Sequence, residues 1–161
     1  MKTITLNQAE LKICEWLAKN RYLKNRKETV KDNKIGPQSC DVTDLDGICG
    51  EFAFCKVMNL YPDMSIHPRS GGHDILIDGK RVDVKTTRYK NGKLLATRNK
   101  TIADSDIYVL IVSNNPKYTI AGWCNASDLI KDDNLVDLGY GLTYAIDQSK
   151  LISLQDFLDN C

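Results

Sequence analysis

An Asp-Gly pair inside a short alternating segment constrains this chain more than any other feature. In GGHDILIDGKRVDVKTT, residues 71–87, Asp78 and Gly79 separate two short runs that read as strands. This dipeptide favours a two-residue type I′ turn, because both of its residues tolerate a positive φ. A loop of that length predicts a hairpin in which Ile77 pairs with Lys80, and it thereby sets the register of both strands.

The predicted register gives the hairpin one apolar face and one charged face. It places Ile75 opposite Val82 and Asp74 opposite Asp83, with Lys85 two residues further along the Asp83 face. Directly opposed like charges destabilise a strand pair. A divalent cation between the carboxylates would remove the repulsion, and hard oxygen ligands suit Mg²⁺ or Mn²⁺. Salt bridging of the carboxylates by Lys85 is the alternative, and the hairpin alone leaves it open.

A third carboxylate, Glu51, lies within a helix that we expect over residues 44–60, before Pro62. Its helical neighbours are all apolar residues or glycine: Gly47, Ile48, Phe54 and Cys55. Glu51 should therefore be partly buried, and a buried carboxylate needs a metal, a cation or a hydrogen-bond donor. Pairing with a structural Arg or Lys is the alternative. Gly47 and Gly50 each cost about 1 kcal/mol relative to Ala in a helix, so both predict a close approach to a backbone or a ligand.

The remaining pattern predicts an α/β (α+β) fold, with helices around a mixed sheet. Helical periodicity covers residues 6–28 and 151–160, and a short helix is expected over 125–132. Further strands are expected over 64–67, 92–98, 106–113, 118–124 and 142–147. The most apolar of these, 106–113, should be central, and 142–147 should be an edge strand.

A length of 161 residues favours one domain. We expect an N-terminal helical segment over 1–35, a core over about 40–131, and a C-terminal strand and helix over 132–161. No membrane span and no secretory signal is evident, so we expect a cytoplasmic protein. The six scattered cysteines include no Cys-x-x-Cys pair, so reduced thiols are expected and not a zinc site.

Charge is arranged in blocks, although the formal net charge is only +1. Residues 1–40 and 65–100 are rich in Lys and Arg, whereas 41–64 and 101–161 are rich in Asp and Glu. This asymmetry suits binding of a polyanion near the hairpin, with an ordinary solvated surface as the alternative. The candidate residues for nucleic-acid binding are Arg21, Lys24, Arg69, Arg81, Thr87, Arg88, Lys90 and Arg98.

Glu51 on a helix, Asp74 on one strand and Asp83-Val84-Lys85 on the next together resemble the motif of the PD-(D/E)XK nuclease superfamily. The likeness covers about residues 40–131. His73 stands where that family usually has a proline before its first aspartate. The resemblance implies a restriction-endonuclease-like core, with a central mixed β-sheet flanked by helices.

The resemblance also implies metal-dependent hydrolysis of DNA phosphodiester bonds. Asp74, Asp83 and Glu51 would hold Mg²⁺ or Mn²⁺, with the backbone carbonyl of Val84 as a further ligand. Lys85 would orient or activate the attacking water, so the expected catalytic residues are Glu51, Asp74, Asp83 and Lys85.

The leading interpretation is a small endonuclease that recognises DNA structure or has low sequence specificity. A homodimer would allow double-strand cuts. The alternatives are a catalytically inactive nucleic-acid-binding module of the same fold and a protein-interaction or inhibitor protein.

Overall fold

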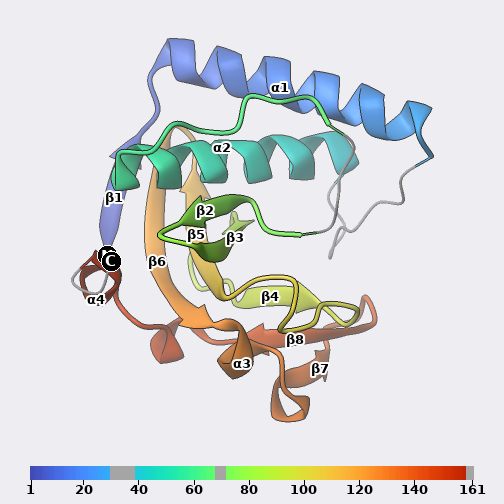
Figure 1. Cartoon of the computed structure of the whole chain (residues 1–161), viewed down its shortest axis with the longest axis vertical. Coiled ribbons are helices and arrows are strands. Elements are labelled where there is room, and N and C mark those ends of the chain that lie inside the picture. The colour runs from blue at the N-terminus through green and yellow to red at the C-terminus, as the bar shows by residue number, and fades with distance from the viewer. Residues whose placement is uncertain (30–38, 68–71, 159–161) are drawn as a thin grey trace.

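A computed structural model gives the arrangement of the chain and describes residues 1–29, 39–67 and 72–158 (Figure 1). A five-stranded mixed sheet has the order β1-β6-β5-β3-β2. Its strands are β1 (Lys2–Thr5), β2 (Ile75–Ile77), β3 (Lys80–Thr87), β5 (Ile107–Asn114) and β6 (Lys117–Asn125). β3 and β5 are parallel, and the other neighbours are antiparallel. The expectation of a mixed sheet flanked by helices is confirmed.

Two long helices cover one face of this sheet. They are α1 (Gln8–Lys27) and α2 (Cys40–Met58), and α2 lies between α1 and the strands (Figure 1). A capping box starts α1, because Asn7 and Glu10 each accept a hydrogen bond from the backbone N–H of the other. α2 ends where Asn59 adopts a left-handed conformation, three residues before Pro62. None of the described helices is long and apolar enough to cross a membrane.

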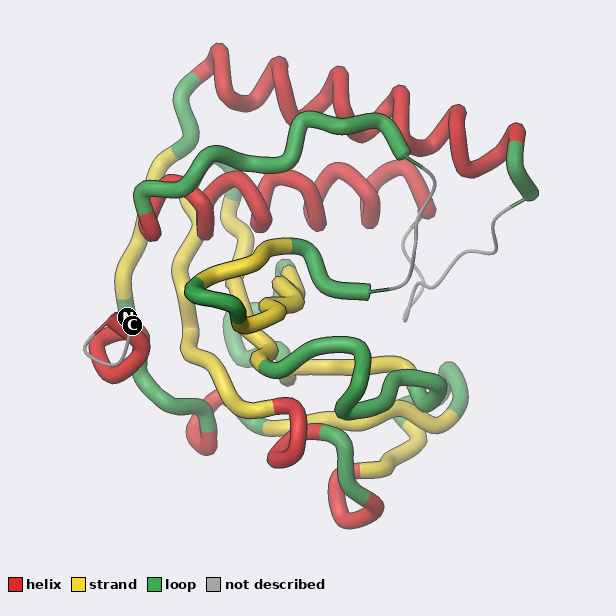
Figure 2. Tube along the Cα trace, viewed as in Figure 1, coloured by secondary structure: helices red, strands yellow, loops and turns green. Residues whose placement is uncertain are grey.

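A second, three-stranded sheet lies on the opposite side of the main sheet from these helices (Figure 2). Its order is β4 (Leu94–Thr97), β8 (Leu142–Ile146), β7 (Leu135–Asp137). The short elements nearby are α3 (Ala126–Leu129), η1 (Asp132–Asn134), η2 (Gln148–Lys150) and α4 (Leu154–Leu158).

The segment β8 is therefore a central strand, and the prediction of an edge strand there was wrong. Residues 64–67 form no strand, and neither β1 nor β7 was predicted.

The strand β5 is buried on both faces, as its apolar sequence predicted. Ile107, Val109 and Ile111 belong to the core beneath α2. Tyr108 and Leu110 belong to the core shared with the smaller sheet. The described cysteines Cys14, Cys49, Cys55 and Cys124 are buried free thiols, as expected.

The hairpin β2–β3 has the predicted register. Ile77 pairs with Lys80, Leu76 with Arg81 and Ile75 with Val82. Asp78 and Gly79 form the loop with φ values of 47° and 78°, as a type I′ turn requires. The ladder ends at Ile75, so Asp74 does not form the predicted ladder pair with Asp83.

Of the two glycines in α2, only Gly50 is required by packing. A Cβ at Gly50 would lie 2.0 Å from Thr86 Oγ1, whereas one at Gly47 would meet nothing within 4 Å. Gly50 thus allows α2 to approach β3 closely, which brings the neighbouring Glu51 toward the hairpin. The close approach at Gly50 is to a side chain and not to the backbone or ligand that was expected, and Gly47 approaches no described atom within 4 Å.

These two glycines give a matched pair of substitutions. Gly50→Ala should lower the free energy of unfolding by about 1–2 kcal/mol, because overpacking outweighs the gain in helix propensity. Gly47→Ala should raise it by about 1 kcal/mol, since it gains propensity without a clash. Chemical denaturation of both variants measures the difference. Equal effects of the two substitutions would contradict the assigned contact with Thr86.

Candidate active site

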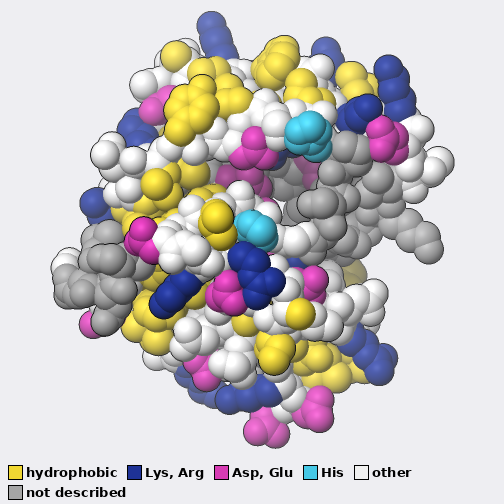
Figure 3. Space-filling model, viewed as in Figure 1, with side chains coloured by type: hydrophobic (Ala, Val, Ile, Leu, Met, Phe, Trp, Pro, Cys, Tyr) yellow, Lys and Arg dark blue, Asp and Glu magenta, His cyan; other side chains and the backbone are white. Residues whose placement is uncertain are grey.

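Three carboxylates from separate elements gather beside the hairpin. Glu51 comes from the middle of α2, Asp74 from the residue before β2, and Asp83 from β3. Figure 3 shows acidic side chains in a recess between the long helices and the hairpin. The predicted residues Glu51, Asp74, Asp83 and Lys85 form one electrostatic group, because the charges of Asp74 and Lys85 act on Glu51 and that of Asp83 acts on Asp74.

Asp83 is the most deeply buried of the three, with 1% of its surface exposed. Its two oxygens contact different ammonium groups. Lys85 Nζ lies 2.5 Å from Oδ1, and Lys100 Nζ lies 3.0 Å from Oδ2. The salt bridge that the hairpin left open as an alternative is therefore present. Sequence reasoning had not placed Lys100 in the site, since only its position in a basic segment hinted at a role.

Asp74 does not pair with Asp83 but forms hydrogen bonds with the residues on either side of it, Val82 and Val84. Its backbone N–H donates to the Val82 carbonyl at 3.0 Å, and its Oδ2 accepts the Val84 N–H at 2.7 Å. Burial and then the charge of Asp83 raise the pKa of Asp74 to about 6, although Lys85 opposes the shift. Asp74 is thus held against β3 by hydrogen bonds while its charge remains poorly compensated.

Glu51 is also mostly buried, with 22% of its side chain exposed. Burial and then the charge of Asp74 raise the pKa of Glu51 to about 8. Arg21 and Lys85 offset this only in part, and the nearest Arg21 nitrogen lies 3.5 Å from Glu51 Oε2. Burial lowers the pKa of Lys85, but the charges of Asp83 and Asp74 outweigh it and raise that pKa above its ordinary value. Lys85 is therefore a cation at neutral pH.

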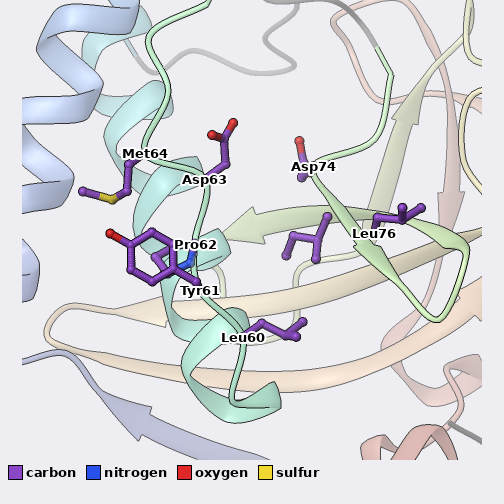
Figure 4. Close-up of a pocket in the computed structure, with 8 residues that line it drawn as sticks. Leu60, Tyr61, Pro62, Asp63, Met64, Asp74 and Leu76 are labelled. Carbon is purple, nitrogen blue, oxygen red and sulfur yellow. The ribbon is translucent and has the colours of Figure 1, made fainter.

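Arg21 connects this group to the segment that follows α2. Its Nε donates to the Ser65 carbonyl at 3.0 Å, and a terminal nitrogen donates to the Asp63 carbonyl at 2.7 Å. Asp63 and Asp74 lie on the two segments that border a pocket of about 420 Å³ (Figure 4). The other lining residues are Leu60, Tyr61, Pro62, Met64, Ile75 and Leu76. Arg21 thus connects α1 to the segment that carries Asp63, and its predicted contact with nucleic acid stays a prediction.

Other predicted nucleic-acid contacts are also engaged within the protein. Arg81 forms a two-pronged ion pair with Asp106, and Arg88 forms one with Asp46. Lys24 pairs with Glu28, and Thr87 Oγ1 accepts the Tyr89 N–H. Lys90 and Arg98 have exposed side chains. Arg69 lies outside the described residues.

The carboxylate oxygens of the site are of the kind that bind a hard divalent cation, although they are not arranged around one. Within residues 1–29, 39–67 and 72–158, no group of three His, Cys, Asp or Glu is arranged to hold a metal ion. The oxygens of Asp83 face ammonium groups instead, and Asp83 Oδ1 is buried without a regular hydrogen bond. Burial and then a neighbouring carboxylate raise the pKa values of Glu51 and Asp74, and Mg²⁺ would stabilise the charged form of such oxygen donors. Asp74, Asp83 and Glu51 remain the predicted ligands, together with the Val84 carbonyl.

Comparison with known proteins identifies a family but no activity. Residues 2–126 match the model of a family of unknown function, DUF5843. The chain belongs to this family. No curated protein and no solved structure matches the chain. The span shared with the DUF5843 family includes Glu51, Asp74, Asp83, Lys85 and Lys100.

The raised pKa of Glu51 predicts a specific pH dependence of stability. A carboxyl group with a pKa of about 8 in the folded protein and its ordinary value of 4.5 in the unfolded chain binds more protons when folded. Stability therefore falls as the pH rises from about 5 to about 8. Glu51→Gln should remove this contribution, so its stability relative to the parent should increase over that range.

Denaturation at several pH values, without divalent cations, measures this difference. Glu28→Gln is the control, because Glu28 is exposed at the end of α1. A Glu51→Gln difference that stays constant from pH 5 to pH 8 would contradict the burial-driven shift.

Proposed function

We propose that this chain is a Mg²⁺-dependent nuclease that hydrolyses DNA phosphodiester bonds on a restriction-endonuclease-like core. One observation carries the proposal. Glu51, Asp74, Asp83 and Lys85, which the sequence resemblance selects, are brought into mutual electrostatic range from α2 and the two strands of the hairpin. Perturbed carboxylates beside a lysine and a pocket are typical of catalytic sites.

Each of these residues has a chemical role in the proposed reaction. A bound Mg²⁺ supplies a Lewis acid and lowers the pKa of its water. Asp74, Asp83 and Glu51 provide the oxygens that would hold it. Lys85 is cationic at neutral pH and is held beside Asp83, so it offers a fixed positive charge to the phosphate as negative charge builds up. Arg21 holds Glu51 and the segment around Asp63 in place.

A catalytically inactive nucleic-acid-binding module of the same fold is the second candidate. It is favoured by the contacts of Asp83, whose two oxygens are both occupied by lysines. An endonuclease that acts on DNA structure or with low sequence specificity remains our leading proposal, and a homodimer would suit double-strand cutting.

Cleavage assays test the proposal directly. Supercoiled plasmid, linear duplex, single strands and a four-way junction are incubated with Mg²⁺, Mn²⁺ or EDTA. The parent should cut at least one substrate only with a divalent cation. Lys85→Ala and Asp74→Asn should each reduce the cleavage rate by about 100-fold or more, since each loses a group that acts on the reacting phosphate or its metal. Lys93→Ala, which removes an exposed lysine paired with Asp147, should cut normally.

The outcomes separate the two candidates. Metal-dependent cutting that survives both Lys85→Ala and Asp74→Asn would refute the assigned site. Salt-dependent DNA binding without any cutting would favour the binding module.

The exposed cations near the hairpin predict how DNA binds. The double substitution Lys90→Ala, Arg98→Ala should weaken binding equally for different sequences, because phosphate contacts carry no sequence information. It should also reduce the slope of log affinity against log salt by about 1 for each phosphate that the variant no longer neutralises. Fluorescence anisotropy at several salt concentrations measures both effects. Lys131→Ala, an exposed lysine after α3, is the control, and an equal weakening in that variant would contradict a local phosphate track.

A further inference from the structure

Lys100 makes a contact that the proposed catalytic scheme does not use. It lies between β4 and β5, and only 15% of its side chain is exposed. Its ammonium donates to Asp83 Oδ2 at 3.0 Å and to the Gly72 carbonyl at 2.9 Å. The lysine is thus fixed at two points beside the carboxylate that we propose as a metal ligand.

The positive charges near the three carboxylates are unevenly distributed. Asp83 has two ammonium groups, from Lys85 and Lys100. For Glu51, in contrast, the nearest Arg21 nitrogen lies 3.5 Å from Oε2, and Asp74 Oδ2 accepts the Val84 N–H. Both ammonium groups therefore contact Asp83, and the charge of Lys100 also acts on Asp74.

A metal ion and Lys100 cannot share Asp83 Oδ2 at close range. Mg²⁺ binds carboxylate oxygens at about 2.0–2.1 Å. An ammonium at hydrogen-bond distance from the same oxygen would then lie a few ångströms from a dication, where repulsion in a buried site is strong. For a cation at Oδ2 the conflict falls on Lys100, because Lys85 contacts the other oxygen, Oδ1.

We infer that Lys100 is a displaceable counter-ion, which occupies Asp83 Oδ2 in the metal-free protein and releases that oxygen when a divalent cation binds. The inference rests on the proposed function, because it takes Asp83 as a metal ligand. The Gly72 carbonyl offers Lys100 a remaining partner after release.

Calorimetric titration with Mn²⁺ tests the competition without any cleavage reaction. Lys100→Met removes the charge but keeps most of the side-chain length, so it should bind Mn²⁺ about tenfold more tightly than the parent. Lys100→Gln keeps a donor and should also bind more tightly. Lys93→Met removes an equal charge away from Asp83 and should leave the affinity unchanged. Unchanged or weaker binding in both folded Lys100 variants would overturn the inference.

A second measurement on the parent does not depend on how the variants fold. Acylation of lysines by an activated ester, followed by mass spectrometry, reports how accessible each ammonium is. Lys100 should react severalfold faster at saturating Mg²⁺ than in EDTA, while Lys93 should not change. If calorimetry shows that Mg²⁺ binds but Lys100 reacts equally fast with Mg²⁺ and with EDTA, Lys100 does not release Asp83 and the inference is overturned.

Asp74→Asn separates a failure of this inference from a failure of the proposed function. If Asp74→Asn weakens Mn²⁺ binding but Lys100 variants do not strengthen it, the metal site stands and the inference about Lys100 fails. If neither the parent nor the Lys100 variants bind Mn²⁺, both fail. If Lys100→Met binds Mn²⁺ where the parent does not, the inference is supported.

Discussion

The buried charge of Asp83 is the constraint on which the surroundings of the site depend. A carboxylate with 1% of its surface exposed is costly unless cations or donors surround it. Lys85 comes from the same strand, but Lys100 brings in the connection between β4 and β5 and also holds Gly72, just before β2. One carboxylate and its two lysines therefore join three segments of the chain.

The parts of the site that follow from local rules could be predicted. The Asp78-Gly79 turn sets the strand register, and the register puts Asp83 and Lys85 on the same side of β3. Helical spacing placed Glu51 among apolar neighbours, and its side chain is indeed mostly buried. In each case the determining contacts lie within a few residues along the chain, where geometry depends little on the rest of the fold.

The parts that depend on contacts distant in sequence could not be predicted. Lys100 reaches Asp83 only because β5 lies parallel to β3, which places the chain before β5 beside the hairpin. Gly47 and Gly50 look alike in the sequence, but only Gly50 faces Thr86. The ion pair of Arg81 could not be predicted either, because its partner Asp106 lies 25 positions further along the chain. A lone charge in a sequence does not reveal whether a distant residue neutralises it.

The ion pair of Arg81 with Asp106, beside the same hairpin, shows how a structural pair differs from the candidate site. Arg81 and Asp106 match two nitrogens to two oxygens, and this pairing holds the pKa of Asp106 well below its usual range. The pKa values of Glu51 and Asp74 are shifted the opposite way, by burial and then by a neighbouring carboxylate, which is Asp74 for Glu51 and Asp83 for Asp74. Apolar residues in their place would pack at least as stably, since buried ionic groups add little net stability. The fold thus keeps the carboxylates of Glu51 and Asp74 close to other negative charge and without a complete ion pair like that of Arg81 and Asp106. This contrast supports a chemical role for the two carboxylates over a structural one.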